Sequence, residues 1–326
     1  MSARPALTWR SPLQKRRYSR GLDLVEQRLT AVATAYPGAL GEACRATLAA
    51  GGKRVRPLLT LLCARRDAAL GEPVLRGATA VELLHMATLV HDDVLDRAEL
   101  RRGRPTVANA YGVETAVSAG NFLLARAFQE LVGSGDAAAV DALSAAAVGL
   151  SEGEVLQRDD SHRSTVTVAG YERRCERKTA DLFAAACRLG ALLGGAADTA
   201  PALAEYGRLI GLAFQVFDDI LDCSGDELST GKRPGTDVRD GTVTLPLIFA
   251  LEERPELAAL LARRDLSAAD VAAVLEAVAR SGALQRARTV ALRYIEQARE
   301  VLNACPGPVE RDLLEQVAAM VVDRYS

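Results

Sequence analysis

The sequence predicts an all-α fold, a single large helical bundle. Apolar residues recur at every third or fourth position through nearly the whole chain, the period of helices that bury one face. Alternating, strand-like runs are almost absent, with residues 166–168 as a short exception, and aromatic residues make up only 4% of the chain. With 326 residues, 49% of them apolar, the chain can bury a large core.

The N-terminal end is basic. Residues 1–20 contain no acid and six cations, which are Arg4, Arg10, Lys15, Arg16, Arg17 and Arg20. We predict a flexible tail over residues 1–20, with a membrane-surface or targeting role as the alternative. No apolar segment follows it that would make a secretory signal. Residues 21–326 are expected to form one all-helical domain, because no linker is long or polar enough to divide them.

The apolar period places the helices in order. They are expected at residues 21–50, 54–69, 74–97, 113–133, 137–158, 168–194, 199–223, 243–252, 256–263, 267–281, 283–304 and 308–324. Several prolines fall near these starts, where a missing N–H costs little. Two segments resist helix assignment, residues 101–106 and 224–242, and both are rich in glycine, proline and cations.

Composition excludes several classes of protein. The net charge of -2 gives no indication of nucleic-acid binding. No apolar run reaches the roughly 18 residues that a transmembrane helix needs. None of the six cysteines forms a C-x-x-C pair, so we expect buried thiols in a reducing cytoplasm rather than a disulfide framework or a zinc site.

One pattern occurs twice. His91-Asp-Asp-Val-Leu-Asp96 returns as Phe217-Asp-Asp-Ile-Leu-Asp222, each time after an apolar stretch and before a cationic loop. The first and last aspartates of each copy lie four apart, which places both on one helix face despite their repulsion and the unfavourable helix dipole. A single copy would fit a solvated helix end equally well, but two copies favour a functional reason. Carboxylates of this kind hold Mg²⁺ together with substrate phosphates. The predicted metal ligands are Asp92, Asp96, Asp218 and Asp222.

Cations gather beside these motifs. Only four of the 40 basic residues are lysines, and three of those lie next to acidic or glycine-rich motifs: Lys53, Lys178 and Lys232. Gly51–Pro57 places three cations at a helix start, and Arg101–Pro105 follows the first aspartate pair. Each cation alone fits a solvated surface residue, but their joint placement favours a phosphate ligand.

These motifs resemble the trans-isoprenyl diphosphate synthase (polyprenyl synthetase) family over about residues 40–250. The matching motifs are Gly51–Pro57, Asp92–Asp96, Arg101-Arg102, Lys178-Thr179, Phe214-Gln215 with Asp218–Asp222, and Lys232. The resemblance implies a helical bundle of the isoprenoid synthase type around a central apolar cavity, and a homodimer. It also implies condensation of isopentenyl diphosphate with an allylic diphosphate, assisted by two or three Mg²⁺ ions.

The resemblance also assigns roles to residues. The set expected to bind isopentenyl diphosphate is Lys53, Arg56, His85 and Arg102. The set expected to face the allylic diphosphate is Arg101, Lys178, Thr179, Gln215 and Lys232. Catalysis is expected to depend on Asp92, Asp96, Asp218, Lys178 and Lys232. His85 alone would fit a core histidine, and Gln215 alone a satisfied core amide. The sequence departs from the family at Thr242, where a second lysine is usual. One contact to the allylic diphosphate is therefore missing or is replaced by Arg233 or Arg239.

Product length is predicted from the helix before the first aspartates. Ala87 and Thr88, followed by Leu84, are small to modest, so nothing there blocks a growing chain, and we expect a product of twenty carbons or more. Phe122 or Phe128 is the expected floor, and Asn121–Leu131 the expected dimer stripe. The alternatives are a short-chain geranylgeranyl or farnesyl diphosphate synthase, a class I terpene cyclase, which has no need for a second diphosphate site, and a non-catalytic partner subunit.

Overall fold

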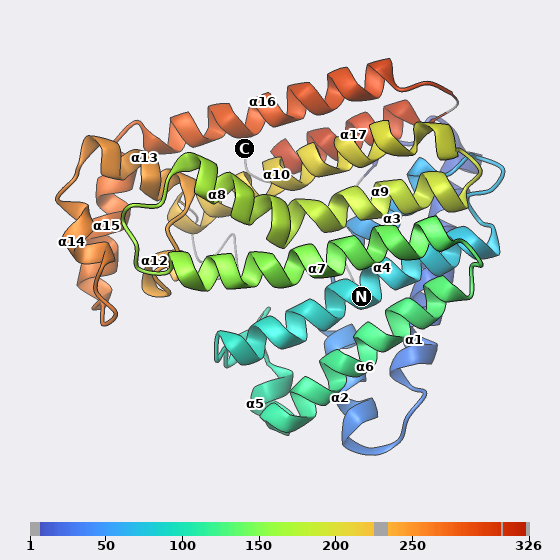
Figure 1. Ribbon diagram of the computed structural model, residues 1–326, viewed down its shortest axis with the longest axis horizontal. Coiled ribbons are helices and arrows are strands. Elements are labelled where there is room, and N and C mark those ends of the chain that lie inside the picture. The colour runs from blue at the N-terminus through green and yellow to red at the C-terminus, as the bar shows by residue number, and fades with distance from the viewer. Residues whose placement is uncertain (1–6, 225–233, 308, 324–326) are drawn as a thin grey trace. The chain divides into compact units, whose positions relative to one another are not determined.

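The computed structural model describes residues 7–224, 234–307 and 309–323, and it is helical almost throughout this part (Figure 1). The contacts within the chain group it into two compact units. Unit 1 consists of Met1–Ala147, Leu182–Gly207 and Val301–Val317, and unit 2 of Val148–Asp181, Arg208–Glu300 and Ala318–Ser326. No linker in the sequence marks this division.

The first part of the chain contains α1 (Pro12–Ala33), α2 (Gly38–Ala49), α3 (Val55–Cys63), α4 (Glu72–Leu95), β1 (Leu100–Arg101), β2 (Arg104–Pro105), α5 (Val107–Tyr111), α6 (Val113–Val132) and α7 (Ala137–Asp160). The middle part contains α8 (Val168–Cys175), a π-helix η1 (Glu176–Ala180), α9 (Asp181–Leu193), a 3₁₀ turn η2 (Ala197–Thr199) and α10 (Ala200–Ser224). The last part contains α12 (Thr236–Arg239), α13 (Leu245–Glu253), α14 (Leu257–Leu261), α15 (Ala268–Arg280), α16 (Ala283–Ala304) and α17 (Arg311–Asp323).

The first expected helix differs in two ways from the prediction. It starts at Pro12, so residues 12–20 of the expected tail are helical. Ser11 caps this start by accepting a hydrogen bond from the Gln14 N–H, and Tyr18 is fully buried. The helix also ends at Ala33 instead of continuing to residue 50. Pro37 explains this break, because its ring excludes the helical conformation before it, and α2 begins directly after it.

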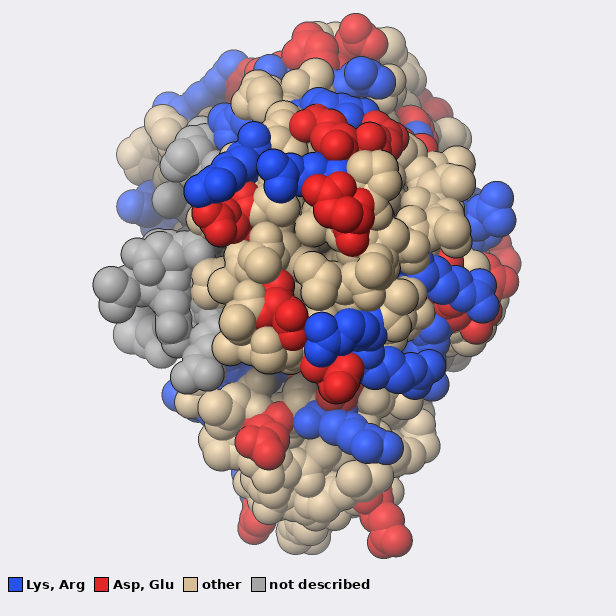
Figure 2. Space-filling model, turned by 90° about the vertical axis from the view of Figure 1, so that its left-hand side faces the viewer, with Lys and Arg blue, Asp and Glu red and all other residues tan. Residues whose placement is uncertain are grey.

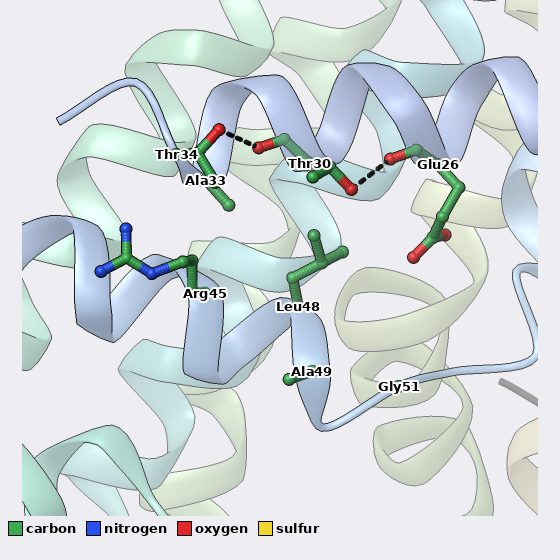
Figure 3. A pocket seen from close by; sticks show the side chains of 8 residues that line it. All are labelled: Glu26, Thr30, Ala33, Thr34, Arg45, Leu48, Ala49 and Gly51. Carbon is green, nitrogen blue, oxygen red and sulfur yellow. Dashed lines mark hydrogen bonds between the residues drawn. The ribbon is translucent and has the colours of Figure 1, made fainter. Parts of the chain in front are cut away.

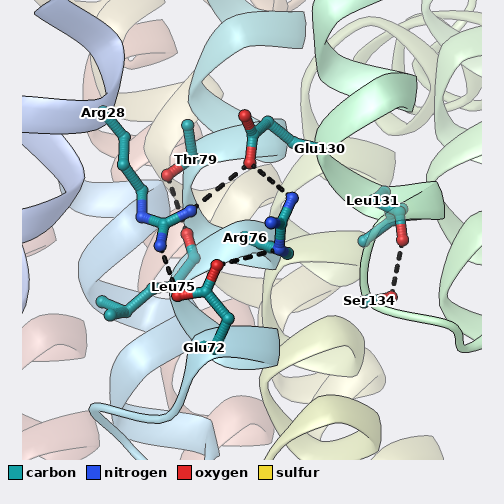
Figure 4. Close-up of polar contacts among 8 residues, drawn as sticks. All are labelled: Arg28, Glu72, Leu75, Arg76, Thr79, Glu130, Leu131 and Ser134. Carbon is teal, nitrogen blue, oxygen red and sulfur yellow. Dashed lines mark hydrogen bonds and ion pairs between the residues drawn. The ribbon is translucent and has the colours of Figure 1, made fainter. Parts of the chain in front are cut away.

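Helix α4 forms the centre of unit 1, and most of its residues are buried. It packs most extensively against α6, and a side chain on Gly120 of α6 would overlap the His91 ring of α4. At the other end of α4, Arg76 contacts Glu72 at 3.0 Å and Glu130 of α6 at 3.3 Å, and Arg28 of α1 contacts both acids (Figure 4). The pairing of opposite ends shows that α4 and α6 are antiparallel.

The packing of α6 narrows the expected dimer stripe to one side of the helix. Within Asn121–Leu131, three apolar residues are buried in the chain itself: Leu123, Ala127 and Leu131. These residues are therefore not available to a second subunit. The other side of α6 keeps exposed apolar side chains, with Val117 39% and Val132 63% exposed.

Unit 1 is completed by a segment from near the C-terminus. The carboxylate of Glu310 is buried and accepts hydrogen bonds from Gln14 at 3.0 Å, Tyr18 at 3.1 Å and Arg66 at 2.8 Å. Such a buried carboxylate is stable because donors surround it. These hydrogen bonds attach α1 to Glu310, which lies almost 300 positions later in the chain.

Figure 2 shows acidic and basic side chains interspersed over the face that it presents. The described residues form no large patch of a single charge on this face. In the described part of the chain, every helix is too short or too polar to pass through a bilayer.

Candidate active site

A β-hairpin positions the arginines that follow the first aspartate motif. Strands β1 and β2 are antiparallel, and the two residues between them, Arg102 and Gly103, have φ angles of 54° and 72°. Positive φ values at both positions are typical of a type I′ two-residue hairpin turn. The turn directs Arg102 to the carbonyl of Gly51, and Arg104 donates to the carbonyl of Ala49 at 3.0 Å. The segment expected to be a loop thus carries Arg102 to the glycine-rich motif.

The glycine-rich motif ends at the start of α3. Lys53 is exposed there, whereas Arg54 is buried and Arg56 is half-buried. The Arg56 guanidinium lies over the Phe183 ring, 4.4 Å from its centroid, and its Nε–H has no hydrogen-bond partner within the described residues. Burial lowers the pKa of Arg56 to about 10, with Glu82 opposing, so the side chain is still a cation near neutral pH.

His85 lies among the arginines of both motifs. Burial lowers its pKa well below the usual value, and the positive charges of four guanidiniums lower it further: Arg56, Arg102, Arg101 and Arg54. The imidazole is therefore neutral and offers one N–H donor. Three of the four residues expected to bind isopentenyl diphosphate, Arg56, His85 and Arg102, thus come together within unit 1, where neighbouring cations suit a ligand of high negative charge.

The three aspartates of the first motif have different surroundings. Asp92 is half-buried and Asp96 exposed on the last turn of α4, where the Asp96 N–H donates to the Asp92 carbonyl at 2.8 Å. Asp93 is buried and accepts from Arg101 Nε at 2.7 Å. Burial raises the pKa of Asp93, and Arg101 opposes this. Arg101, expected to face the allylic diphosphate, therefore holds the middle aspartate.

In unit 2, the lysine-threonine motif forms the π-helix η1. Lys178 Nζ contacts Glu154 of α7 at 2.6 Å. A Cβ on Gly153 would lie 2.5 Å from the Lys178 backbone nitrogen, so only glycine permits this approach. A π-helical turn inside a longer helix is frequent at functional sites. It interrupts the expected helix 168–194 with one irregular turn.

A hydrogen-bond chain joins the lysine-threonine motif to the second aspartate motif. Thr179 donates to the Gln215 carbonyl oxygen at 2.7 Å, and Gln215 Nε2 donates to Asp219 at 2.8 Å. The Tyr171 hydroxyl donates to the other oxygen of Asp219 at 2.6 Å. Burial raises the pKa of Asp219 to about 7, and these donors oppose the shift. The buried middle aspartate again has a structural role.

The last aspartate of the second motif caps a short helix. The carboxylate of Asp222 accepts from the N–H groups of Thr236 at 3.1 Å and Asp237 at 3.0 Å, which begin α12. Burial and then Asp222 raise the pKa of Asp237 well above its usual value. Asp237 thus belongs to the surroundings of this motif. Asp218 is half-buried, and the predicted Lys232 and Arg233 lie outside the described residues.

The comparisons with known proteins match these motifs. A model of the family described as polyprenyl synthetase matches residues 37–278. The chain belongs to the polyprenyl synthetase family. Heptaprenyl diphosphate synthase component 2 of Geobacillus stearothermophilus is 39% identical over 305 residues, 93% of this chain and 95% of that protein. Geranylgeranyl diphosphate synthase of Methanosarcina mazei is 38% identical over 294 residues, 88% of this chain and 90% of that protein.

A solved structure of the polyprenyl synthetase family shows the same fold. Heptaprenyl diphosphate synthase from Staphylococcus aureus superimposes with a TM-score of 0.89 at 31% identity, over 95% of this chain and 99% of that one. The expected family and the expected all-α fold of the isoprenoid synthase type are therefore confirmed.

The carboxylates of this polyprenyl synthetase suit a metal that the substrate helps to bind. No three His, Cys, Asp or Glu side chains converge on one point in the described part of the chain. Asp92 and Asp96, on one helical turn, offer hard oxygen ligands, which fits Mg²⁺ with phosphate oxygens and water completing its shell.

The residues expected to set product length line the interior of unit 1. Leu84 and Ala87 are 2% and 1% exposed, and Thr88 donates its hydroxyl to the His85 carbonyl at 2.9 Å. His91, one turn beyond Ala87, packs against α6, so this face of α4 looks towards α6. Phe122 packs edge-on against Tyr36, with ring centroids 5.1 Å apart.

Sequence reasoning missed the partners of the predicted residues. The buried acids Asp93 and Asp219 and the acids Glu82, Glu154 and Asp237 were not singled out. A signal existed for Asp93, because it continues the buried stripe of Leu83, Met86 and Val90 at spacings of three and four. Glu82 lies beside that stripe, and its charge in an apolar helix was the clue.

Proposed function

We propose that this chain is a trans-prenyltransferase that condenses isopentenyl diphosphate with an allylic diphosphate to make a linear polyprenyl diphosphate of twenty carbons or more. The observation that carries the proposal is the cationic cluster around His85, which precedes Asp92 by two turns of α4. A diphosphate site and a carboxylate pair on one helix suit a reaction between two diphosphates. The membership in the polyprenyl synthetase family supports the same reaction.

The site residues divide between the two substrates in this proposal. Lys53, Arg56, His85 and Arg102 bind isopentenyl diphosphate. Lys178, Thr179 and Gln215, together with Lys232, bind the allylic diphosphate, and Arg101 supports it by holding Asp93. Two or three Mg²⁺ ions are proposed as the cofactor, with Asp92, Asp96 and Asp218 as ligands. Asp222 has a supporting role in metal binding, because both of its carboxylate oxygens already accept hydrogen bonds at the start of α12.

The reaction proposed begins with loss of the allylic diphosphate. Bound Mg²⁺ supplies Lewis acidity towards the leaving group. The fixed cations of the chain stabilise the charge that develops on the departing diphosphate. The double bond of isopentenyl diphosphate then attacks the allylic cation, and the released diphosphate takes up the proton. The apolar side chains of α4 exclude water that would capture the cation.

The product length is proposed from the small residues on α4. One helical turn rises about 5.4 Å, close to the length of one isoprene unit. Replacing Ala87 by Phe should shorten the product and leave the first condensation intact, because the ring would fill the first layer of the wall. Thr88→Val, which changes polarity but not size, is the matched control. A wild type that stops at fifteen carbons, or an unchanged product of Ala87→Phe, would refute the assignment of Ala87, Thr88 and Leu84.

A cytoplasmic location is proposed from the cysteines. All six are free and buried: Cys44, Cys63, Cys175, Cys187, Cys223 and Cys305. Unpaired thiols are typical of a reducing compartment.

The deciding experiment uses the purified chain with Mg²⁺, isopentenyl diphosphate and a series of allylic primers, and resolves the products by chain length. A linear product of twenty or more carbons supports the proposal. A cyclic hydrocarbon would identify a terpene cyclase instead. Activity that requires a second protein would identify a partner subunit, and the name of the Geobacillus relative as a component makes this control necessary.

A further inference from the structure

Arg54 differs from the other cations of the glycine-rich motif because it points into the protein. It is 7% exposed, whereas its neighbour Lys53 is exposed. Its backbone has a φ of 53° and a ψ of 36°, the left-handed conformation, which is unfavourable for a residue with a side chain. A residue persists in this conformation only where its surroundings hold it. Arg54 is also the residue directly before α3.

Two carboxylates hold Arg54 in this position. Its Nη1 donates to Glu82 of α4 at 2.7 Å, and its Nε and Nη2 donate to Glu26 of α1 at 2.9 and 3.2 Å. Burial disfavours its charge, but the two acids more than offset this, so the pKa of Arg54 stands above its ordinary value. Three of its five N–H groups are therefore bound within the protein. This distinguishes Arg54 from Arg56, whose Nε–H is unpaired in the described part of the chain.

The two acids differ in their access to water. The side chain of Glu82 is 4% exposed, and that of Glu26 is 39% exposed. Glu26 lines a pocket of about 280 Å³ between α1 and α2, together with Thr30, Arg45 and Leu48 (Figure 3). Water screens an ion pair at such an edge. Arg54 and Glu82, by contrast, form an ion pair that is buried on both sides. Loss of either partner leaves an uncompensated buried charge.

Glu82 also lies at the centre of the cationic cluster. It precedes His85 by one helical turn, and its charge favours the cationic form of Arg56. A Cβ on Gly52 would lie 3.0 Å from Arg54 Nη1, 3.4 Å from Arg102 Nη1 and 3.8 Å from Glu82 Oε1. Two guanidiniums of like charge thus approach the same glycine beside a single buried carboxylate. Without that carboxylate they would repel each other and leave this arrangement.

We propose that Arg54 and Glu82 form a positioning pair, which holds Lys53, Arg56 and Arg102 in place for the isopentenyl diphosphate before that substrate binds. Arg54 does not itself contact the diphosphate. The pair fixes the backbone between Lys53 and Arg56, and Glu82 balances the charge of the empty site. Such preorganisation improves binding because less reorganisation accompanies it. The inference rests on the proposed function, since it concerns the same site.

The test measures binding and kinetics of two isosteric variants. Glu82→Gln should weaken the binding of isopentenyl diphosphate alone, followed by calorimetry without an allylic primer, by about 10- to 100-fold, the range typical of lost supporting partners. The KM for isopentenyl diphosphate should rise equally, while the KM for the allylic primer and kcat at saturation change less than about twofold. Glu26→Gln, the control at the exposed partner of the same arginine, should weaken binding less than about threefold.

The coupling between the partners completes the test. Arg54→Met combined with Glu82→Gln should bind isopentenyl diphosphate no more weakly than Arg54→Met alone, because the pair is already lost. Arg54→Lys keeps the charge and should bind isopentenyl diphosphate more tightly than Arg54→Met. It replaces Glu82→Gln as the test variant if Glu82→Gln does not fold. Equal effects on both substrates, or unchanged binding in Glu82→Gln, would overturn the proposal. Wild-type chain that binds isopentenyl diphosphate without condensing it would refute the proposed function but leave this pair testable.

Discussion

The aspartates within one motif differ in their surroundings, although they are the same residue type. In each aspartate motif the middle residue is buried and held by donors, Asp93 by Arg101 and Asp219 by Tyr171 and Gln215. The first residues, Asp92 and Asp218, are half-buried. The first aspartates are therefore the ones that we propose as metal ligands, whereas the middle ones are held within the protein by hydrogen bonds.

Replacing Asp92 or Asp218 by alanine should abolish turnover, by at least about 100-fold, without unfolding the protein. Each change removes an ion ligand and relieves repulsion within the motif. Turnover at saturating Mg²⁺ and the melting temperature give the two readouts. Asp93→Asn is the contrasting variant and should lower the melting temperature, since it weakens a buried ion pair. Substantial activity in either alanine variant would contradict the metal assignment.

Replacing Lys53 or Arg102 by alanine should raise the KM for isopentenyl diphosphate about tenfold or more, and that for the allylic primer far less. The reason is the loss of a cation from the cluster around His85. Arg104→Ala is the matched control, because Arg104 lies in the same hairpin and donates to a similar carbonyl but is not among the cations that act on His85. If all three variants, or both substrates, respond alike, the division into two diphosphate sites is wrong.

The neutral His85 predicts a pH dependence of stability. Its pKa in the folded protein lies well below the usual value, because of burial and the neighbouring arginines, whereas the unfolded chain takes up the proton near pH 6.5. The stability that follows is present above pH 6.5 and is lost as the pH falls below it, by up to about 1.4 kcal/mol per pH unit.

The measurement is the free energy of unfolding of wild type and His85→Gln between pH 7.5 and 5.5. The wild type should lose up to about 1.4 kcal/mol more than the variant over this range. Parallel curves for the two proteins would show that His85 is not held neutral.

At the scale of elements, an irregular helix carries the lysine-threonine motif. The π-helix η1 contacts α7 where Gly153 leaves room for the Lys178 backbone. Neither Lys178 nor Thr179 would reach its partner from a regular helix in the same way, because an added residue in one turn rotates everything after it. The irregular turn therefore positions both Lys178 and Thr179 against their partners.

Gly153→Ala should destabilise the protein by about 1–3 kcal/mol and lower kcat/KM for the allylic substrate about tenfold. The added Cβ meets backbone atoms of Lys178, which cannot rotate away. Gly170→Ala in α8 is the control, since its Cβ would lie 3.4 Å from Thr167 Oγ1, an ordinary contact, and alanine favours a helix. Thermal melting and steady-state kinetics would be compared, and equal behaviour of the two variants would exclude a special role for η1.

At the scale of the whole molecule, a homodimer is predicted through the outer side of α6. Four apolar residues follow one another there at spacings of seven, four and four, which keeps them on one side of the helix: Val117, Leu124, Phe128 and Val132. Light scattering should give about twice 34.6 kDa. Leu124→Arg should shift this mass towards the monomer, and Leu292→Arg on α16, an exposed leucine elsewhere, should not. A wild-type monomer at micromolar concentration would contradict the prediction.

Much of the fold could be predicted from sequence because the period of apolar residues identifies a helix from a short stretch of sequence. The apolar period located α4, α6, α7 and α10 within a few residues, and the aspartate spacing located both candidate metal motifs. Contacts between distant residues could not be found this way. Arg54 meets Glu82 across 28 residues and Lys178 meets Glu154 across 24, and a one-dimensional pattern shows which face is buried but not what covers it. The turn at Arg102-Gly103 also escaped, because Arg-Gly is not among the dipeptides that mark hairpins.

The attachment of Glu310 to Gln14 and Tyr18 has a consequence during protein synthesis. Unit 1 needs residues 301–317, so its first 147 residues emerge from the ribosome long before the segment that completes them. At about 5–20 residues per second, the 153 residues between take roughly 8–30 s to translate. During that interval α1 lacks the carboxylate that accepts from its buried tyrosine. An apolar face of the nascent chain stays uncovered, and a chaperone has time to bind it.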